Sequence, residues 1–69
     1  MPGPVDVALS PRQREVLALI SRGVRAREIA AELGVTQATA RNHIRDVLRR
    51  LDCHSQLEAV ARARQCRLL

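Results

Sequence analysis

Three arginines at four-residue intervals are the side chains of this sequence with the clearest chemical potential. Arg41, Arg45 and Arg49 lie within the stretch VTQATARNHIRDVLRRL, which spans residues 35–51. A helix places side chains four apart on one face, so these guanidinium groups would form a single cationic ridge without intervening acids. Like charges at this spacing repel by roughly 0.2–0.5 kcal/mol. A polyanionic partner would reverse that cost, because guanidinium groups bind phosphate oxygens in a bidentate manner.

Catalytic or metal-binding use of the other reactive side chains is not expected. His43 and Asp46 are three residues apart on one predicted helix, but Ser55, which would complete a catalytic set, is better placed to cap a helix. A chain of 69 residues also leaves few positions for an internal pocket. Cys53 and Cys66 lack the paired spacing of zinc ligands. We therefore predict free thiols, no metal, no cofactor and no enzymatic activity.

The composition favours an anionic partner. The formal net charge is +5, and all twelve basic residues are arginine, although genome base composition alone would give the same bias. The chain has no Phe, Tyr or Trp, the rings on which modules for single-stranded nucleic acids usually stack bases. A nucleic-acid partner is therefore expected to be a duplex.

Nothing in the sequence suggests a membrane segment. The first ten residues, MPGPVDVALS, have neither a basic leader nor an apolar run, and no segment approaches the roughly 18 apolar residues that a bilayer span requires. We expect a cytoplasmic domain with no membrane partner and no small-molecule ligand.

Capping residues and apolar periodicity predict an all-α domain. Ser10, Pro11 and Gln13 form the N-cap, first position and capping box of a first helix, which Gly23 ends. Its buried stripe would contain Val16, Leu17 and Ile20. Residues 1–8 show no periodicity and are interpreted as a flexible lead-in or linker remnant, which leaves residues 9–69 as one compact four-helix domain.

A short interval between the second and third helices predicts a helix-turn-helix. The second helix carries the apolar residues Ile29, Ala30 and Leu33, and Gly34 is placed as its left-handed C′ residue. Thr36 then caps the third helix, so only about three residues separate the two. The third helix would bury Ala40, Ile44, Val47, Leu48 and Leu51, and expose Ala38, Arg41, Asn42, Arg45 and Arg49.

The last helix is expected to begin with a second capping box, formed by Ser55 and Glu58. Its inner stripe would be Leu57, Val60 and Ala61. The small residues Ala59, Ala63 and Cys66 would then gather on the outer side. This patch is either a close contact between two copies or an ordinary surface on which alanine serves helix propensity.

The stretches LSPRQREVLALISRG, EIAAELGVTQATARNHIRDVLRRL and SQLEAVARA occur in this order and together resemble the LuxR-type (GerE-type) helix-turn-helix domain. The resemblance covers residues 9–69. It implies sequence-specific binding of double-stranded DNA in a bacterial transcription regulator, where such a module is usually the C-terminal effector, as in response regulators. The chain would then be either an excised domain or a stand-alone regulator.

Positions carried over from the resemblance predict the contacts. Base reading would fall on Arg41, Asn42 and Arg45, and phosphate contacts on Arg27, Thr36, Thr39, His43 and Arg49. The last helix commonly pairs across a dimer in this family, which would give Ala59, Ala63 and Cys66 a role in a homodimer on DNA. Asp52 stands where glycine usually ends the third helix, so that corner is expected to be strained.

Two other functions remain open from the sequence. The first is a helical protein-interaction module that docks to transcription machinery such as RNA polymerase, although such a surface would need apolar anchors in place of the arginine ridge. The second is a cationic membrane-active peptide, which would need broader apolar faces than these Ala- and Val-rich stripes provide.

Overall fold

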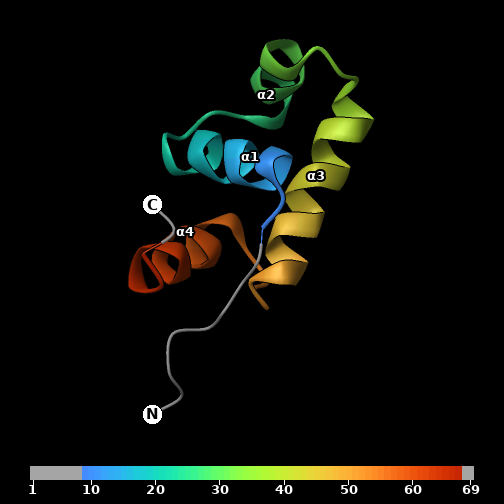
Figure 1. The fold of residues 1–69 in the computed structure, drawn as a ribbon. Helices are drawn as coiled ribbons and strands as arrows, with labels where there is room; N and C mark the ends of the chain where they lie inside the picture. Colours follow the sequence, from blue (N-terminus) through green and yellow to red (C-terminus); the bar gives the residue numbers. More distant parts are fainter. Residues whose placement is uncertain (1–8, 68–69) are drawn as a thin grey trace.

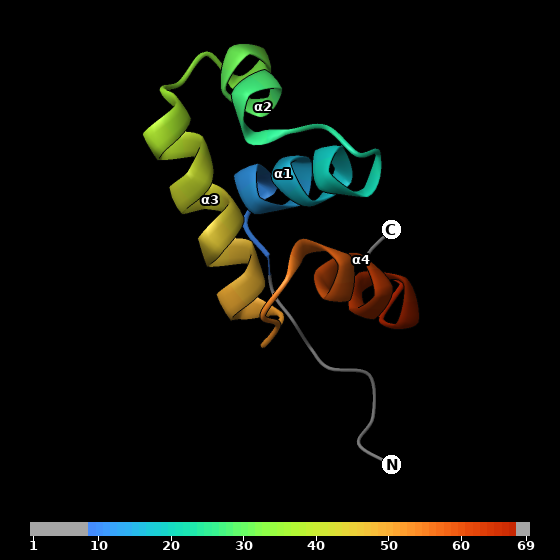
Figure 2. The same cartoon turned by 180° about the vertical axis from the view of Figure 1, so that it is seen from behind.

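The computed structural model describes residues 9–67 of the chain. Within this range it contains four α-helices and no β-strand: α1 (Pro11–Ser21), α2 (Ala26–Leu33), α3 (Gln37–Arg50) and α4 (Gln56–Gln65). The longest helix, α3, runs along one side of the domain, and α1 lies between α2 and α4 (Figures 1 and 2). The predicted all-α helix-turn-helix architecture is confirmed. The predicted lead-in over residues 1–8 lies outside the described residues.

The N-caps predicted for α1 and α3 are both formed by side-chain hydrogen bonds. Ser10 Oγ accepts from the Gln13 N–H at 3.1 Å, and Gln13 Oε1 accepts from the Ser10 N–H at 2.9 Å, which completes the capping box of α1. Thr36 Oγ1 accepts from the Thr39 N–H at 3.1 Å at the start of α3. Gly34 ends α2 with φ +69°, a left-handed conformation that glycine adopts without steric cost.

The cap of α4 differs from the prediction in one respect. Ser55 Oγ accepts from the Glu58 N–H at 3.1 Å, as expected. The Glu58 carboxylate, however, accepts from the N–H of His54 at 2.8 Å, one residue before the N-cap. This backbone hydrogen bond is the main reason that the pKa of Glu58 lies below its ordinary value of 4.5. The carboxylate thus fastens the α3–α4 connection to the first turn of α4.

The hydrophobic core lies where α3 packs against α1, α2 and α4. Its largest fully buried side chains are Val16, Leu17, Ile29, Val47 and Leu51. These residues belong to the stripes predicted for the first three helices, because amphipathic periodicity identifies the apolar face of a helix. Ala30 and Ala40 are also buried, and small side chains at these positions allow α2 and α3 to approach closely.

The orientation predicted for α4 is wrong for most of its residues, although Val60 of the predicted inner stripe does pack against the core. Ala59 and Ala63 are fully buried, whereas Leu57 is 82% exposed and Ala61 is exposed. The physical reason is distance: small side chains let the backbone of this helix lie close to its neighbours, so packing selected alanine over leucine for the inner face. Arg62 also stabilises this orientation of α4. Its Nη1 donates to the Leu51 carbonyl oxygen at 3.1 Å, which holds this side of α4 against the end of α3.

Candidate nucleic-acid interface

The outer face of α3 is polar, cationic and open to solvent. Its predicted outward residues, Ala38, Arg41, Asn42, Arg45 and Arg49, are all exposed. On the opposite side, Ala40, Ile44 and Val47 are buried, and Leu48 is partly buried against the core. The prediction of both faces is confirmed. The buried side of α3 therefore directs the arginine ridge, defined as Arg41, Arg45 and Arg49, toward solvent.

One acid lies beside the ridge, contrary to the expectation that none would intervene. Asp46 Oδ1 is 3.9 Å from Arg49 Nη1, and the Arg49 and Asp46 side chains are 73% and 50% exposed. Ion pairs this exposed contribute little to stability because water screens them. The pair does lower the local positive charge at the C-terminal end of the ridge, which leaves Arg41 and Arg45 as the stronger cationic positions.

The turn that leads into α3 is ordered by two threonines. Besides capping the helix, the Thr36 hydroxyl donates to Thr39 Oγ1 at 2.9 Å. Thr36 is exposed and Thr39 half-buried. Both stand at a helix N-terminus, where the free backbone N–H groups and the helix dipole favour an anion. These two predicted phosphate contacts are thus brought together in space.

The remaining predicted phosphate contacts lie on different elements. His43 is half-buried on the flank of α3, and Arg27 is exposed in the first turn of α2. Arg27 lines a surface hollow with Arg25 and Glu28. The predicted contact set therefore combines one position on α2 with the N-terminal end and outer face of α3.

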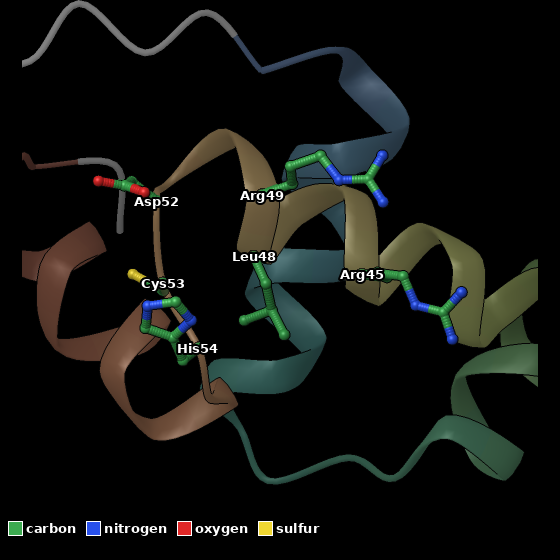
Figure 3. A pocket seen from close by; sticks show the side chains of 6 residues that line it. All are labelled: Arg45, Leu48, Arg49, Asp52, Cys53 and His54. Carbon is green, nitrogen blue, oxygen red and sulfur yellow. The ribbon is translucent and has the colours of Figure 1, made fainter.

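An open hollow adjoins the C-terminal half of the ridge (Figure 3). It has a volume of about 360 Å³ and is lined by Arg45, Leu48, Arg49, Asp52, Cys53 and His54. The sequence analysis did not predict that His54 lines the same hollow as Arg45 and Arg49. The chain reverses at Asp52, whose φ of +55° is left-handed, and this reversal brings residue 54 back toward α3. The strain expected at Asp52 agrees with this left-handed φ, which an aspartate adopts less readily than the glycine usual at this position.

The thiol at this corner is buried and unsuited to act as an anion. Cys53 Sγ donates to the Leu51 carbonyl oxygen at 3.3 Å, and burial raises the pKa of the Cys53 thiol above its ordinary value of 9.0. Cys53 and Cys66 are both free. Within residues 9–67, no group of three or more His, Cys, Asp or Glu side chains is arranged to hold a metal ion.

Two of the three residues predicted to form a dimer contact cannot do so in the folded chain. Ala59 and Ala63 are covered by the core of their own domain, for the packing reason given above. Cys66, the C-cap of α4, is half-buried. The described part of the chain also has no helix with the length and apolar character needed to cross a membrane.

Two features define the class of this domain. It has a helix-turn-helix fold, and its third helix exposes a cationic face to solvent. The family model for bacterial regulatory proteins of the luxR family matches residues 7–63. The chain therefore belongs to the luxR family, as the resemblance implied. This is a family of transcription regulators and not a family of enzymes.

Individual relatives agree with this membership. The chain is 37% identical over 57 residues to the transcriptional regulatory protein DesR of Bacillus subtilis, covering 83% of this chain and 29% of DesR. It is 33% identical over 60 residues to the nitrate/nitrite response regulator protein NarL of Escherichia coli, covering 87% of this chain and 28% of NarL.

The fold is also found in a solved structure. The response regulator ChrA of a heme-sensing two-component system aligns with a TM-score of 0.85 and 34% identity, over 90% of this chain and 31% of ChrA. The chain thus spans less than a third of the length of each of these three relatives.

Proposed function

We propose that this domain binds double-stranded DNA in a sequence-dependent manner, with α3 inserted into the major groove. The observation that carries the proposal is the exposed arginine ridge on a helix whose other face is buried. A major groove accepts one α-helix, and the base edges displayed there distinguish all four base pairs. A duplex-DNA ligand would place the domain in the bacterial cytoplasm.

The side chains on the outer face of α3 have the chemistry needed to read bases. Arg41 and Arg45 can each donate two hydrogen bonds to O6 and N7 of guanine. Asn42 can pair with N6 and N7 of adenine. All three are exposed. We therefore assign base reading to this trio, with a preference for sites that contain guanine.

Phosphate contacts would set the position of the helix in the groove. We assign them to Arg27, Thr36, Thr39, His43 and Arg49. Such contacts fix register and orientation but carry no direct sequence information. The hydrogen-bonded threonines at the start of α3 support this role because they add hydroxyl groups to a helix end that already favours anions.

Pairing of two copies on DNA would use the exposed face of α4. Leu57, Ala61 and Arg64 lie on one side of this helix, opposite buried Ala59 and Ala63. Leu57 is a large apolar side chain with 82% exposure, which favours a protein contact. Leu57→Glu should abolish cooperative binding to a two-site duplex and leave single-site affinity unchanged; equal cooperativity would contradict pairing through this face.

Protein docking through α3 is less well supported. The exposed side chains of its outer face include no large apolar residue that would anchor a protein partner.

The proposal can be tested by selecting bound duplexes from a random library and measuring affinity for the selected site. If about four phosphates are neutralised, log K should fall against log salt with a slope near −3.6. Arg41→Ala should cost about 1–3 kcal/mol and relax selectivity at one base pair, whereas Arg49→Ala should weaken all sequences about equally.

A matched control is available at Arg22. This residue is the C-cap of α1, and that end of α1 points away from α3 in both views (Figures 1 and 2). Arg22→Ala removes the same charge and should change the affinity far less than Arg41→Ala. Equal losses from the two variants, or a flat salt dependence, would contradict binding through α3.

A further inference from the structure

A second surface hollow, on the α1–α2 side of the domain, differs in character from the DNA-binding face. It has a volume of about 280 Å³ and is lined by Glu15, Ala18, Leu19, Glu32 and Leu33. We propose that this hollow docks a short basic segment of another protein, in which an aliphatic side chain is flanked by arginine or lysine residues. We call it the acid-rimmed hollow.

The floor of the acid-rimmed hollow is apolar and can be reached from solvent. Leu19 is buried at its base, whereas Ala18 and Leu33 are partly exposed. An aliphatic side chain placed here would remove apolar surface from water on both partners, which is favourable in proportion to the area covered. The floor therefore accounts for the aliphatic residue in the proposed segment.

The rim supplies the charge that would select a basic partner. Glu15 and Glu32 are exposed, and neither side chain takes part in a hydrogen bond or ion pair with the rest of residues 9–67. By contrast, Asp46 lies near Arg49, and Glu58 accepts from a backbone N–H. The two rim carboxylates are thus left without a partner in a domain of net charge +5.

The charge of the acid-rimmed hollow also sets it apart from its neighbours. Three other surface hollows each include at least one arginine, at Arg45, Arg64 or Arg25. The acid-rimmed hollow has none among its lining residues. Two carboxylates would repel a phosphate backbone and attract basic side chains, so charge complementarity favours a basic protein segment over DNA.

Occupation of this hollow is compatible with DNA binding. None of its lining residues belongs to α3, and none is among the base-reading or phosphate-contacting positions. A partner could therefore hold the domain while α3 lies in the groove. The proposal does not depend on DNA, since the hollow is formed by the free domain.

The test uses peptides and the isotopically labelled chain, observed by NMR. The probe is a peptide with a central leucine and an arginine about one helical turn to each side, on an alanine–glutamine background. One comparison peptide replaces leucine by serine, and another replaces both arginines by glutamate. We expect the probe alone to shift the amide signals of Ala18, Leu19 and Leu33, and both comparison peptides to bind more weakly.

Variants of the rim provide the matched control. Glu15→Gln combined with Glu32→Gln should weaken probe binding roughly 2- to 30-fold, since two exposed charge pairs are lost. Asp52→Asn removes an exposed acid that follows α3 and lies outside this hollow, and it should leave the peptide affinity unchanged. DNA affinity, measured on the same samples, should not fall in either protein, which separates this proposal from the proposed function.

Several results would overturn the inference. Equal binding of the serine peptide would reduce the interaction to unspecific charge attraction, and equal binding of the glutamate peptide would remove the charge argument. Equal changes in the amide signals of Asp46, Asp52 and Glu58 would show that the probe binds acidic residues in general and not this hollow. No binding of the probe would reject the site. Concentration-dependent shifts at the hollow without peptide would assign it to a second copy of this chain.

Discussion

A pair of alanines on α4 allows the observed packing of this helix to be tested directly. Ala61 and Ala63 are two residues apart, but Ala61 is exposed whereas Ala63 is fully buried. Glutamate at either position changes helix propensity and net charge by the same amount. The difference in stability between Ala61→Glu and Ala63→Glu therefore reports which side of α4 faces the core.

The expected difference is large for a domain of this size. A chain of 69 residues should have a free energy of unfolding of about 3–10 kcal/mol. A carboxylate forced into the fully buried site of Ala63 has no prepared partner and should cost about 3–5 kcal/mol. At the exposed site of Ala61 the change should stay within about 0.5 kcal/mol.

Urea unfolding followed by far-UV circular dichroism, at two protein concentrations, measures this difference. If Ala63→Glu does not fold, Ala63→Val compared with Ala61→Val gives a milder version, because overpacking a core costs about 1–3 kcal/mol. Equal stability of the two members of a pair, or a larger loss at Ala61, would refute the observed orientation of α4. It would also return Ala59 and Ala63 to the outer face, where the sequence pattern had placed them.

Three further substitutions test particular contacts. Asp46→Asn removes the carboxylate 3.9 Å from Arg49 and should raise DNA affinity about 1.4- to 5-fold at low salt, as measured by fluorescence anisotropy; a fall would mean that Asp46 positions the arginine. Asp52→Gly relieves a left-handed φ of +55° and should raise the free energy of unfolding by about 0.5–1 kcal/mol in urea titrations; a loss would reveal a stabilising role of the carboxylate. Folding lowers the pKa of Glu58 below 4.5, so its stabilising contribution is present above that pH and is lost as the pH falls through the folded pKa. Unfolding curves at about pH 6 and pH 3 should therefore show a larger loss of stability for the wild type than for Glu58→Gln, and equal losses would argue against the His54 hydrogen bond.

The features that were predicted correctly depend on neighbours in the chain. Ser10 and Thr36 cap their helices with side-chain hydrogen bonds that reach only three residues along the sequence. The arginine ridge follows from helical periodicity alone. The proximity of Asp46 to Arg49 was also within reach, since residues three apart on a helix lie side by side. The prediction missed this proximity because it used only the four-residue spacing of the arginines.

The features that were missed depend on segments that are distant in sequence. The backbone of α4 lies close enough to its neighbours to select Ala59 and Ala63 for the inner face, although Leu57 is more hydrophobic. The partner of Arg62 is a carbonyl eleven residues away. Neither distance is encoded in the periodicity of α4, which is compatible with either side facing inward.

By itself, the sequence determined that this protein is a small all-α helix-turn-helix domain of the luxR family, with a cationic third helix. Caps, turn residues and apolar periodicity depend only on residues that are close together in the sequence, so they do not depend on how the helices pack against one another. Only the tertiary structure decided which face of α4 is buried, that His54 lines the same hollow as Arg45 and Arg49, and that residues of α1 and α2 together line the acid-rimmed hollow. These properties arise from the distance between helices, and close packing fixes that distance once all four are in place.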